Sequence, residues 1–495
     1  MRGRLIGIGG LALAFGFCLV LLRGEPSVAN DQGVFLSVAA RLLDGDRLYV
    51  DVIDNKDPLF YYTYAAALAV AGWRGPFLLD AIWLALAAIS MPLLARELRA
   101  PRSAVVASFF LYPLALTAPW YLAGLSMLAA LAFAPLAPWL WLRGRFAGAG
   151  VVVAIVMLFK LNIAPVCVAP IGALVVLGHP VRPGRREILR GALGLCGALL
   201  AAAAVLGVRG ELRAYFDTVA YNVHYASALS DGSVHGRIHQ HLLVVFDIFD
   251  RAGPWQLPVS LLVLGAFGIA VAVGWRRGTT PERALVGVAT ATLLGSAVVL
   301  ALTAYWEHHL QLLAYPGTLV AVTLISVAAF ACRRAGGVLA VAFVSFAFWT
   351  SLSEGGGLGL SSAWGTAPVS GGAVALERAR KRFDPVSRDV TYMVLGTNHE
   401  RAHAAFIGDE FDLVCRWFQL YPFSLPEQFD ETLACAERKR PLFVLVTPGF
   451  VARRPDPRAW ASFVARSKAL LERHYELVEA PRPGVQVWRR TPSPT

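Results

Sequence analysis

The sequence predicts a polytopic α-helical membrane protein of about eleven transmembrane helices with a small C-terminal extracytoplasmic α/β domain. Three observations lead to this prediction. The 495 residues are 57% hydrophobic and only 16% charged, far from the composition of a soluble domain. Apolar runs long enough to cross about 30 Å of hydrocarbon recur from residue 5 to about residue 353. Beyond that point charges become dense, and the apolar runs shorten to the length of strands.

The net charge of +12 is distributed like a membrane-topology signal. A protein that reads nucleic acid gathers its basic residues on one face, whereas here they cluster in short loops between apolar runs. We therefore expect no nucleic-acid partner and a cytoplasmic location for each cluster. The clusters are Arg2/Arg4, Arg96/Arg99/Arg102, Arg143/Arg145, Arg182/Arg185/Arg186/Arg190, Arg276/Arg277/Arg283 and Arg333/Arg334.

These clusters orient the predicted spans. The first runs from about residue 5 to 22, with a cytoplasmic N-terminus, and the loop 23–75 lies outside. Residues 59–73 are apolar but short and rich in tyrosine, and we expect an interfacial helix there, because a span would place Arg96–Arg102 outside. An odd number of spans puts the C-terminus outside. The remaining spans are expected at about 76–95, 103–118, 121–142, 146–159, 162–178, 188–207, 255–274, 284–303, 310–331 and 335–353.

The first span has a second interpretation. Ser27-Val28-Ala29 resembles the small-residue cleavage site of a signal peptide, so this apolar run could be removed rather than retained.

The last third of the chain changes character. Gly355-Gly356-Gly357 and further Gly and Ser residues predict a linker over 354–388. An α/β domain over 389–495 follows, with strands over 390–395, 442–446 and 485–488 and a helix over 459–474. Cys415 and Cys435 lie in this domain, where an oxidising exterior would allow them to pair, although the sequence leaves the pairing open. The other four cysteines lie in apolar spans.

Residues 30–60 form the most polar stretch of the membrane domain. A multi-span protein does not need so many ionisable groups in a loop merely to reverse direction. Asp31 could act as a general base, with Gly33 permitting close approach of a ligand, or it could cap the helix predicted over 34–43. Lys56, in Asp54-Asn55-Lys56-Asp57-Pro58, could hold a phosphate as a point charge, or pair with Asp54 or Asp57.

Three later segments carry further candidates. Lys160 stands between two apolar runs on the side opposite the arginine clusters, where it could serve a site or simply snorkel to the interface. The outer loop 208–254 holds Tyr221 and Asn222, followed by several histidines. His239 and His241 have strand-like spacing and no thiol or carboxylate cluster nearby, so no metal site is assigned. Glu307 and the pair His308-His309 open a late span; the imidazoles could neutralise a lipid phosphate or pair with Glu307.

The order of these features resembles the GT-C superfamily of membrane glycosyltransferases. The matching features are Asp31-x-Gly33 after the first span, the aromatic-rich Lys56-x-Pro58 segment, Lys160 between two mid-chain spans, and His308-His309. Within the superfamily the chain looks like the branch of bacterial protein-mannosyltransferase-like and lipid A aminoarabinose-transferase-like enzymes. The resemblance covers residues 1–353, which implies a GT-C-like transmembrane glycosyltransferase domain there.

The resemblance implies inverting transfer of a sugar from a polyprenyl-phosphate donor to a hydroxyl of a cell-envelope acceptor. Asp31 matches the family's base and Lys56 its donor-phosphate contact. Lys160, His308 and His309 are expected to assist with the phosphate, and Asp54, Tyr221 and Asn222 to bind substrate. No cofactor is expected to be required, and a divalent metal is an alternative that the sequence does not support. Asn55 stands where relatives often carry Glu or Gln, and its replacement of Glu weakens metal ligation, while Asp57 partly offsets the positive charge offered to phosphate.

Two other classes of function fit less well. A transporter or flippase would carry ionisable groups near the bilayer midplane and two related halves, whereas these spans are almost free of charge and show no such similarity. A receptor anchored by its spans would not need so many. A glycan polymerase or ligase with a diphosphate donor usually displays arginine-rich outer loops, and here the arginines are mainly inside. The high Ala, Gly and Arg content indicates a bacterial plasma membrane with the active face outward.

Overall fold

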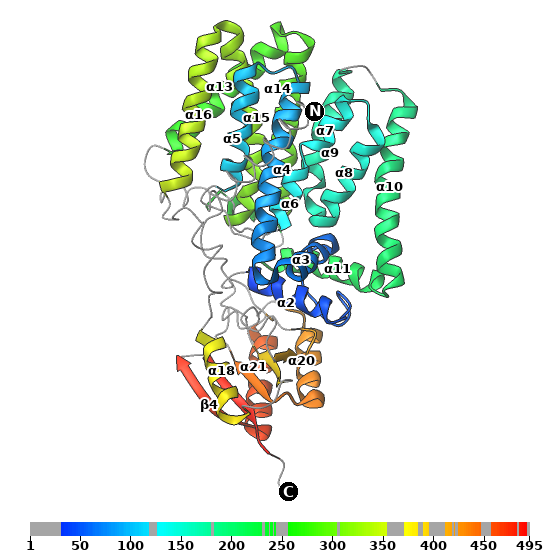
Figure 1. Ribbon diagram of the computed structural model, residues 1–495, viewed down its shortest axis with the longest axis vertical. Coiled ribbons are helices and arrows are strands. Elements are labelled where there is room, and N and C mark those ends of the chain that lie inside the picture. Colours follow the sequence, from blue (N-terminus) through cyan, green and yellow to red (C-terminus); the bar gives the residue numbers. More distant parts are fainter. Residues whose placement is uncertain are drawn as a thin grey trace.

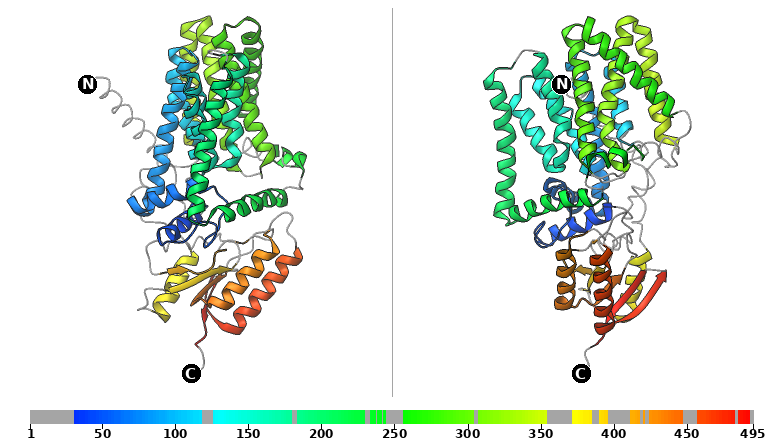
Figure 2. Two further views of the ribbon diagram at one scale, coloured as in Figure 1. Left: turned by 90° about the vertical axis from the view of Figure 1, so that its right-hand side faces the viewer. Right: turned by 180° about the vertical axis from the view of Figure 1, so that it is seen from behind.

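The computed structural model describes residues 31–117, 126–179, 183–229, 233–236, 238–240, 242–243, 256–303, 307–353, 371–384, 390–395, 411–417, 420, 424–446, 457–482 and 485–492. A long helical bundle forms one end of the molecule and a small α/β domain forms the other (Figure 1). A layer of helices lies between them, across the end of the bundle (Figure 2). The first predicted span and the alternative cleavage site lie outside the described residues.

Each span predicted between residues 76 and 353 contains helix in its described part. Five helices are long and apolar enough to cross a membrane by length and composition: α4, α10, α13, α14 and α15, the last counted from His309. The others are shorter, so the chain is a multi-pass membrane protein. The helices are α4 (Gly75–Glu97), α5 (Arg102–Leu116), α6 (Ser126–Phe133), α7 (Leu136–Leu142), α8 (Phe146–Phe159), α9 (Ala164–Leu177), α10 (Arg185–Val208), α13 (Gln256–Arg277), α14 (Thr280–Leu302), α15 (Ala314–Ala331) and α16 (Arg333–Ser353).

Proline and glycine account for two local features of the bundle. The run predicted as one span over 121–142 is broken between α6 and α7 at Pro135, which has no backbone N–H to continue the helix.

Helix α10 packs against α8 at the edge of the bundle (Figure 1). Gly150 of α8 faces the carbonyl of Gly191, and Gly194 of α10 faces that of Ala147, so closely that a Cβ at either glycine would clash. Small residues therefore allow the backbones of α8 and α10 to approach closely.

The layer across the end of the bundle consists of α2 (Asp31–Leu43), α3 (Pro58–Ala71) and α11 (Leu212–Leu229) (Figure 1). Helix α3 occupies the segment expected to form an interfacial helix. Its 14 residues give a length of about 21 Å, too short to cross the hydrocarbon of a bilayer. Phe35 of α2 packs edge-on against Phe60 and Tyr64 of α3, with ring centroids 4.9 and 6.1 Å apart.

The C-terminal domain contains a five-stranded sheet of order β2-β1-β3-β5-β4. Strand β1 pairs in parallel with β2 and β3, and β5 pairs antiparallel with β3 and β4. The three predicted strands are confirmed as β1, β3 and β5, and the predicted helix as α21, whereas β2 and β4 were not predicted. The elements are α18 (Gly371–Phe383), β1 (Val390–Leu395), β2 (Phe411–Leu413), α20 (Pro426–Lys439), β3 (Phe443–Val446), α21 (Pro457–His474), β4 (Tyr475–Arg482) and β5 (Val485–Arg490).

The predicted linker over 354–388 is wrong in its later part, because α18 occupies 371–383 and packs against the sheet. The glycines at the start of α18 led to the prediction of a linker instead of a helix. Ala375, Leu376 and Ala379 nevertheless form a buried apolar stripe on this helix. Residues on alternate sides of β1 contact different layers. Tyr392 and Val394 join the core on the α18 side, while Met393 joins the core formed with α20 and α21.

Cys415 and Cys435 form a disulfide, with their Cα atoms 6.1 Å apart. The bond joins the segment after β2 to helix α20. The structure thus settles a pairing that the sequence left open.

Candidate functional site

The candidate site lies where the first outer loop meets the end of the bundle and α11. Lys56 stands between α2 and α3, and its ammonium lies 5.3 Å from the centre of the Phe35 ring and donates to the side-chain oxygen of Asn55. The hydroxyl of Tyr49 donates to the backbone carbonyl of Lys56 at 2.7 Å. Pro58 begins α3 in the favourable first-turn position. These contacts hold a half-buried lysine just before a helix N-terminus.

Asp57 connects three separate segments. Its carboxylate accepts a hydrogen bond from the backbone N–H of Leu161 at 2.9 Å and another from the hydroxyl of Tyr215, on α11, at 2.8 Å. Although Asp57 is the N-cap residue of α3, its side chain makes no capping bond to that helix. The first N–H groups of α3 are therefore not satisfied by their own N-cap side chain.

Lys160 lies beside this carboxylate. It is the residue at which α8 ends, and its extended backbone leads into the 3₁₀ turn η2 (Leu161–Ile163). Burial raises the pKa of the half-buried Asp57 carboxyl from 3.8 to about 6, against the opposing effect of bonds from Leu161 and Tyr215 and of the charges of Lys160 and Lys56. At pH 7 Asp57 is mostly ionised, so one anion lies near two lysines.

Helix α11 supplies the predicted substrate-binding pair. The side-chain amide of Asn222 donates to the backbone carbonyl of Asn55 at 2.9 Å, and its own oxygen is buried without a hydrogen-bond partner in the described part of the chain. The ring of Tyr221 packs against Trp417 of the C-terminal domain, and burial raises the pKa of Tyr221 to about 12. Asp54 accepts a hydrogen bond from the hydroxyl of Tyr61. The structure thus brings Asp54, Lys56, Lys160, Tyr221 and Asn222 to one region.

Glu211 is a structural part of this region that sequence reasoning missed. Its fully buried carboxylate accepts from the backbone N–H of Leu48 at 3.0 Å, from Arg209 at 2.8 Å and from the hydroxyl of Tyr62. It therefore ties the first loop and α3 to the corner between α10 and α11. A carboxylate directly after an apolar run, two residues from an arginine, was the available signal. Asp57 was considered as a partner of Lys56 and as a charge that weakens phosphate binding, and its connecting role was missed.

The remaining predicted site residues are less completely described. Asp31 is the first residue of α2, and its side chain lies outside the described part, as does that of His308. Position 31 is one helical turn before Phe35, so the two positions share a face of α2. His309 is buried in η3 (Glu307–Leu313), which packs on α6 and α14; both helices also contact η2 beside Lys160.

No group of three or more His, Cys, Asp or Glu side chains suited to a metal is found among the residues that the structure describes. His241 lies outside that part. The expectation that no metal is required stays a prediction.

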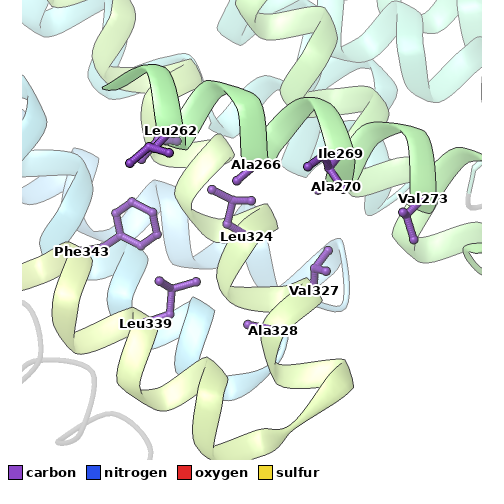
Figure 3. A pocket seen from close by; sticks show the side chains of 11 residues that line it. Leu262, Ala266, Ile269, Ala270, Val273, Leu324, Val327, Ala328, Leu339 and Phe343 are labelled. Atoms are coloured by element: carbon purple, nitrogen blue, oxygen red, sulfur yellow. The ribbon is translucent and has the colours of Figure 1, made fainter. Parts of the chain in front are cut away.

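An apolar cleft of about 440 Å³ lies between α13, α15 and α16 (Figure 3). Leu262, Ile269, Leu324 and Phe343 are among its lining residues, all of which are apolar. The cleft can hold hydrocarbon but offers no group for acid, base or phosphate chemistry. None of its lining residues belongs to the segments that carry the lysines.

Comparison with known proteins supports the architecture. No protein-family model matches the chain, and no curated protein matches it in sequence. The solved structures that match the chain include two that cover nearly its whole length. ArnT from Cupriavidus metallidurans bound to undecaprenyl phosphate has a TM-score of 0.57 and 12% identity, over 98% of each chain. ArnT in the apo state has a TM-score of 0.55 and 12% identity, over 99% of this chain and 98% of the other.

At this identity the likeness shows the fold alone. Because the match covers 98% of the chain, it includes the C-terminal domain, where the sequence resemblance was weak. The chain therefore has the fold of ArnT, which confirms the GT-C-like helical architecture predicted from the sequence.

Proposed function

We propose that this protein is an inverting glycosyltransferase that uses a polyprenyl-monophosphate sugar and acts at the outer face of a bacterial plasma membrane. The acceptor is a hydroxyl of a cell-envelope glycan, lipid or protein. The observation that carries the proposal is that Lys56 and Lys160 come together near Asp57, which follows Lys56 in the chain and accepts a hydrogen bond from the residue after Lys160. A protein of the same fold has been solved with undecaprenyl phosphate bound.

The two lysines have the chemistry needed for the donor phosphate. A lysine ammonium holds phosphate as a point charge, and the N-terminus of α3 adds N–H groups that its own N-cap side chain does not use. In the proposed reaction Lys56 and Lys160 bind the phosphate and stabilise it as it leaves. We assign a supporting role to His308 and His309, on the basis that η3 and η2 pack on the same two helices.

Asp31 is the proposed general base. It takes the proton of the acceptor hydroxyl as the oxygen attacks the anomeric carbon, while the polyprenyl phosphate leaves on the opposite side. Direct displacement inverts the anomeric configuration and needs only one carboxylate, unlike hydrolysis by an acid and base pair. Position 31 shares a face of α2 with Phe35, whose ring lies against Lys56, which supports this assignment. Asn222, with its unpaired side-chain oxygen, together with Tyr221 and Asp54, is proposed to bind substrate hydroxyls.

The orientation follows from the two ends of α8. Arg145 precedes the helix and Lys160 ends it, so the arginine cluster Arg143/Arg145 and the candidate site lie at opposite ends. Under the positive-inside rule the arginines face the cytoplasm and the lysine site faces outward. The C-terminal domain, beyond the layer of α2, α3 and α11, is then extracytoplasmic (Figure 1).

Sugar transfer in membranes tests the proposal. Membranes that carry the wild-type chain, Asp31→Asn or Asp51→Asn receive a panel of labelled polyprenyl-phosphate hexoses and pentoses together with envelope acceptors. Loss of a general base should lower turnover by about 10²–10⁴-fold in Asp31→Asn. Asp51 is the matched control, because its carboxylate pairs with Arg47 at the surface of the same loop, and its variant should transfer normally.

Equal activity of Asp31→Asn and the wild type would refute the assignment of the base. Binding of polyprenyl phosphate by purified protein tests the broader proposal, because binding does not require the acceptor. Lys56→Ala should weaken that binding. Transport of the donor without transfer, or no binding by the wild type, would count against a transferase.

A further inference from the structure

The C-terminal domain makes direct contact with the first outer loop. Arg41 on α2 donates to the backbone carbonyl of Cys415 at 3.1 Å, and the backbone N–H of Ile53 donates to the carbonyl of Arg416 at 3.1 Å. The same Arg41 side chain donates to the carbonyl of Asp51 at 3.0 Å and pairs with Asp46. One arginine thus binds both the loop and the domain beneath it.

The segment Cys415–Trp417 is in turn fixed to α20 of its own domain. The disulfide links Cys415 to Cys435 on that helix. The indole N–H of Trp417 donates to Glu431 at 2.9 Å, and the guanidinium of Arg416 pairs with the same carboxylate. Three consecutive residues are therefore attached to one helix, which leaves the segment little freedom to move independently.

Trp417 starts a path of contacts that ends at the candidate phosphate site. Its ring lies 6.1 Å from that of Tyr221, centre to centre, at an angle of 67°. The next residue, Asn222, donates to the backbone carbonyl of Asn55 at 2.9 Å. The side-chain oxygen of Asn55 accepts from Lys56. Each step is a contact between described residues, and the path joins the C-terminal domain to Lys56 through α11.

We propose that the C-terminal domain helps to position the donor site. Trp417 is the positioning residue, and it acts on Lys56 through contacts made by Tyr221, Asn222 and Asn55. This inference rests on the proposed function. Trp417 does not touch the reacting atoms; it fixes the place of α11, and α11 fixes the loop that carries the lysine. Because Lys56 binds the donor phosphate and stabilises it as it leaves, loss of this support weakens donor binding and also slows the chemical step.

The test uses the full-length protein in lipid nanodiscs, with undecaprenyl phosphate as the binding probe. Trp417→Ala should weaken binding about 10-fold, raise the donor KM and also lower kcat, because a misplaced Lys56 binds the phosphate less well and stabilises it less as it leaves. Trp417→Phe keeps a ring against Tyr221 and should restore most of the affinity. The matched control is Trp488→Ala, since Trp488 packs within the C-terminal domain and bonds to Gln486. Trp488→Ala should destabilise the C-terminal domain but leave the affinity for undecaprenyl phosphate unchanged.

A double-mutant cycle distinguishes the positioning of Lys56 by Trp417 from a purely structural role of Trp417. If Trp417 acts through Asn222, then Trp417→Ala should have almost no further effect on affinity in an Asn222→Ala background. Additive effects, or wild-type affinity in Trp417→Ala, would overturn the inference while leaving the proposed function intact. Equal loss of affinity in Trp417→Ala and Trp488→Ala would also overturn it, by assigning the loss to unfolding of the domain. Failure of the wild type to bind undecaprenyl phosphate would count against the proposed function, and this inference would fall with it.

Discussion

Replacing Asp57 with asparagine should stabilise the fold near neutral pH, although it removes a charge from the centre of the candidate site. In the folded protein the pKa of this carboxyl is raised from 3.8 to about 6, chiefly by burial. A raised pKa means that the ionised carboxylate is less favourable in the folded state than in the unfolded chain. Asparagine resembles the protonated acid in shape and carries no charge to desolvate.

The size of the effect follows from the shift. A change from 3.8 to about 6 corresponds to at most about 3 kcal/mol at pH 7 and above. Contact of the half-buried side chain with water lowers this figure. The penalty is absent below about pH 3, where both states are protonated, grows between about pH 4 and pH 6, and levels off above that. At pH 5 the advantage of Asp57→Asn should be about half of its value at pH 8.

Thermal unfolding followed by tryptophan fluorescence, at several pH values between 5 and 8, measures this difference. Asp51→Asn is a control of opposite sign, because the hydrogen bond from Arg47 lowers the pKa of Asp51, so its removal should not stabilise the protein at neutral pH. Tyr215→Phe removes a donor to ionised Asp57 and should destabilise the wild type more than the Asp57→Asn variant. The reasoning is refuted if Asp57→Asn is less stable than the wild type at pH 8, or if its advantage is the same at pH 5.

Three further predictions concern the framework around the site. Glu211→Ala should cost about 1–3 kcal/mol, because it leaves the buried backbone N–H of Leu48 unsatisfied and removes the partner of the exposed Arg209, and proteolysis of the first loop should report the loss. Cys435→Ser opens a disulfide with a sequence separation of 20 and should cost the C-terminal domain about 3 kcal/mol in denaturant unfolding; a stability equal to the wild type would contradict this. Gly194→Leu should separate α10 from α8 and lower the melting temperature, whereas Gly197→Ala, where nothing lies within 4 Å of the added carbon, should be neutral or stabilising.

Local pattern was sufficient for most of the helices and strands. The composition of an apolar run is sufficient to predict that it is buried or in contact with lipid. The spans between 76 and 353 could therefore be identified without knowing which helices pack against them. The same holds for the interfacial helix at 59–73 and for β1, β3 and β5. The exceptions include β2, β4 and α18. Helix α18 was missed because Gly371 and Gly372 continue a glycine-rich stretch, and its short apolar stripe can be interpreted only together with the sheet that it covers.

The candidate site was predicted in part. Lys56 and Lys160 stood out as polar residues at the ends of apolar runs, and Tyr221 and Asn222 stood out in an outer loop; the structure brings all four to one region. The roles of Asp31 and His308 stay predictions, since their side chains lie outside the described part. Glu211 drew no attention in the sequence, because two of its partners, Leu48 and Tyr62, lie in distant segments.

The sequence by itself determined the membrane class, most of the helical segments and the polar first loop, because these depend on composition and on spacing along one segment. Tertiary structure alone decided that Asp57 joins the loop to Leu161 and Tyr215, residues that are 104 and 158 positions away. It also decided the pairing of Cys415 with Cys435 and the contact of Trp417 with Tyr221. Hydrogen bonds and ring contacts form between groups that the fold brings within a few ångströms, and no local pattern encodes which distant segments will meet.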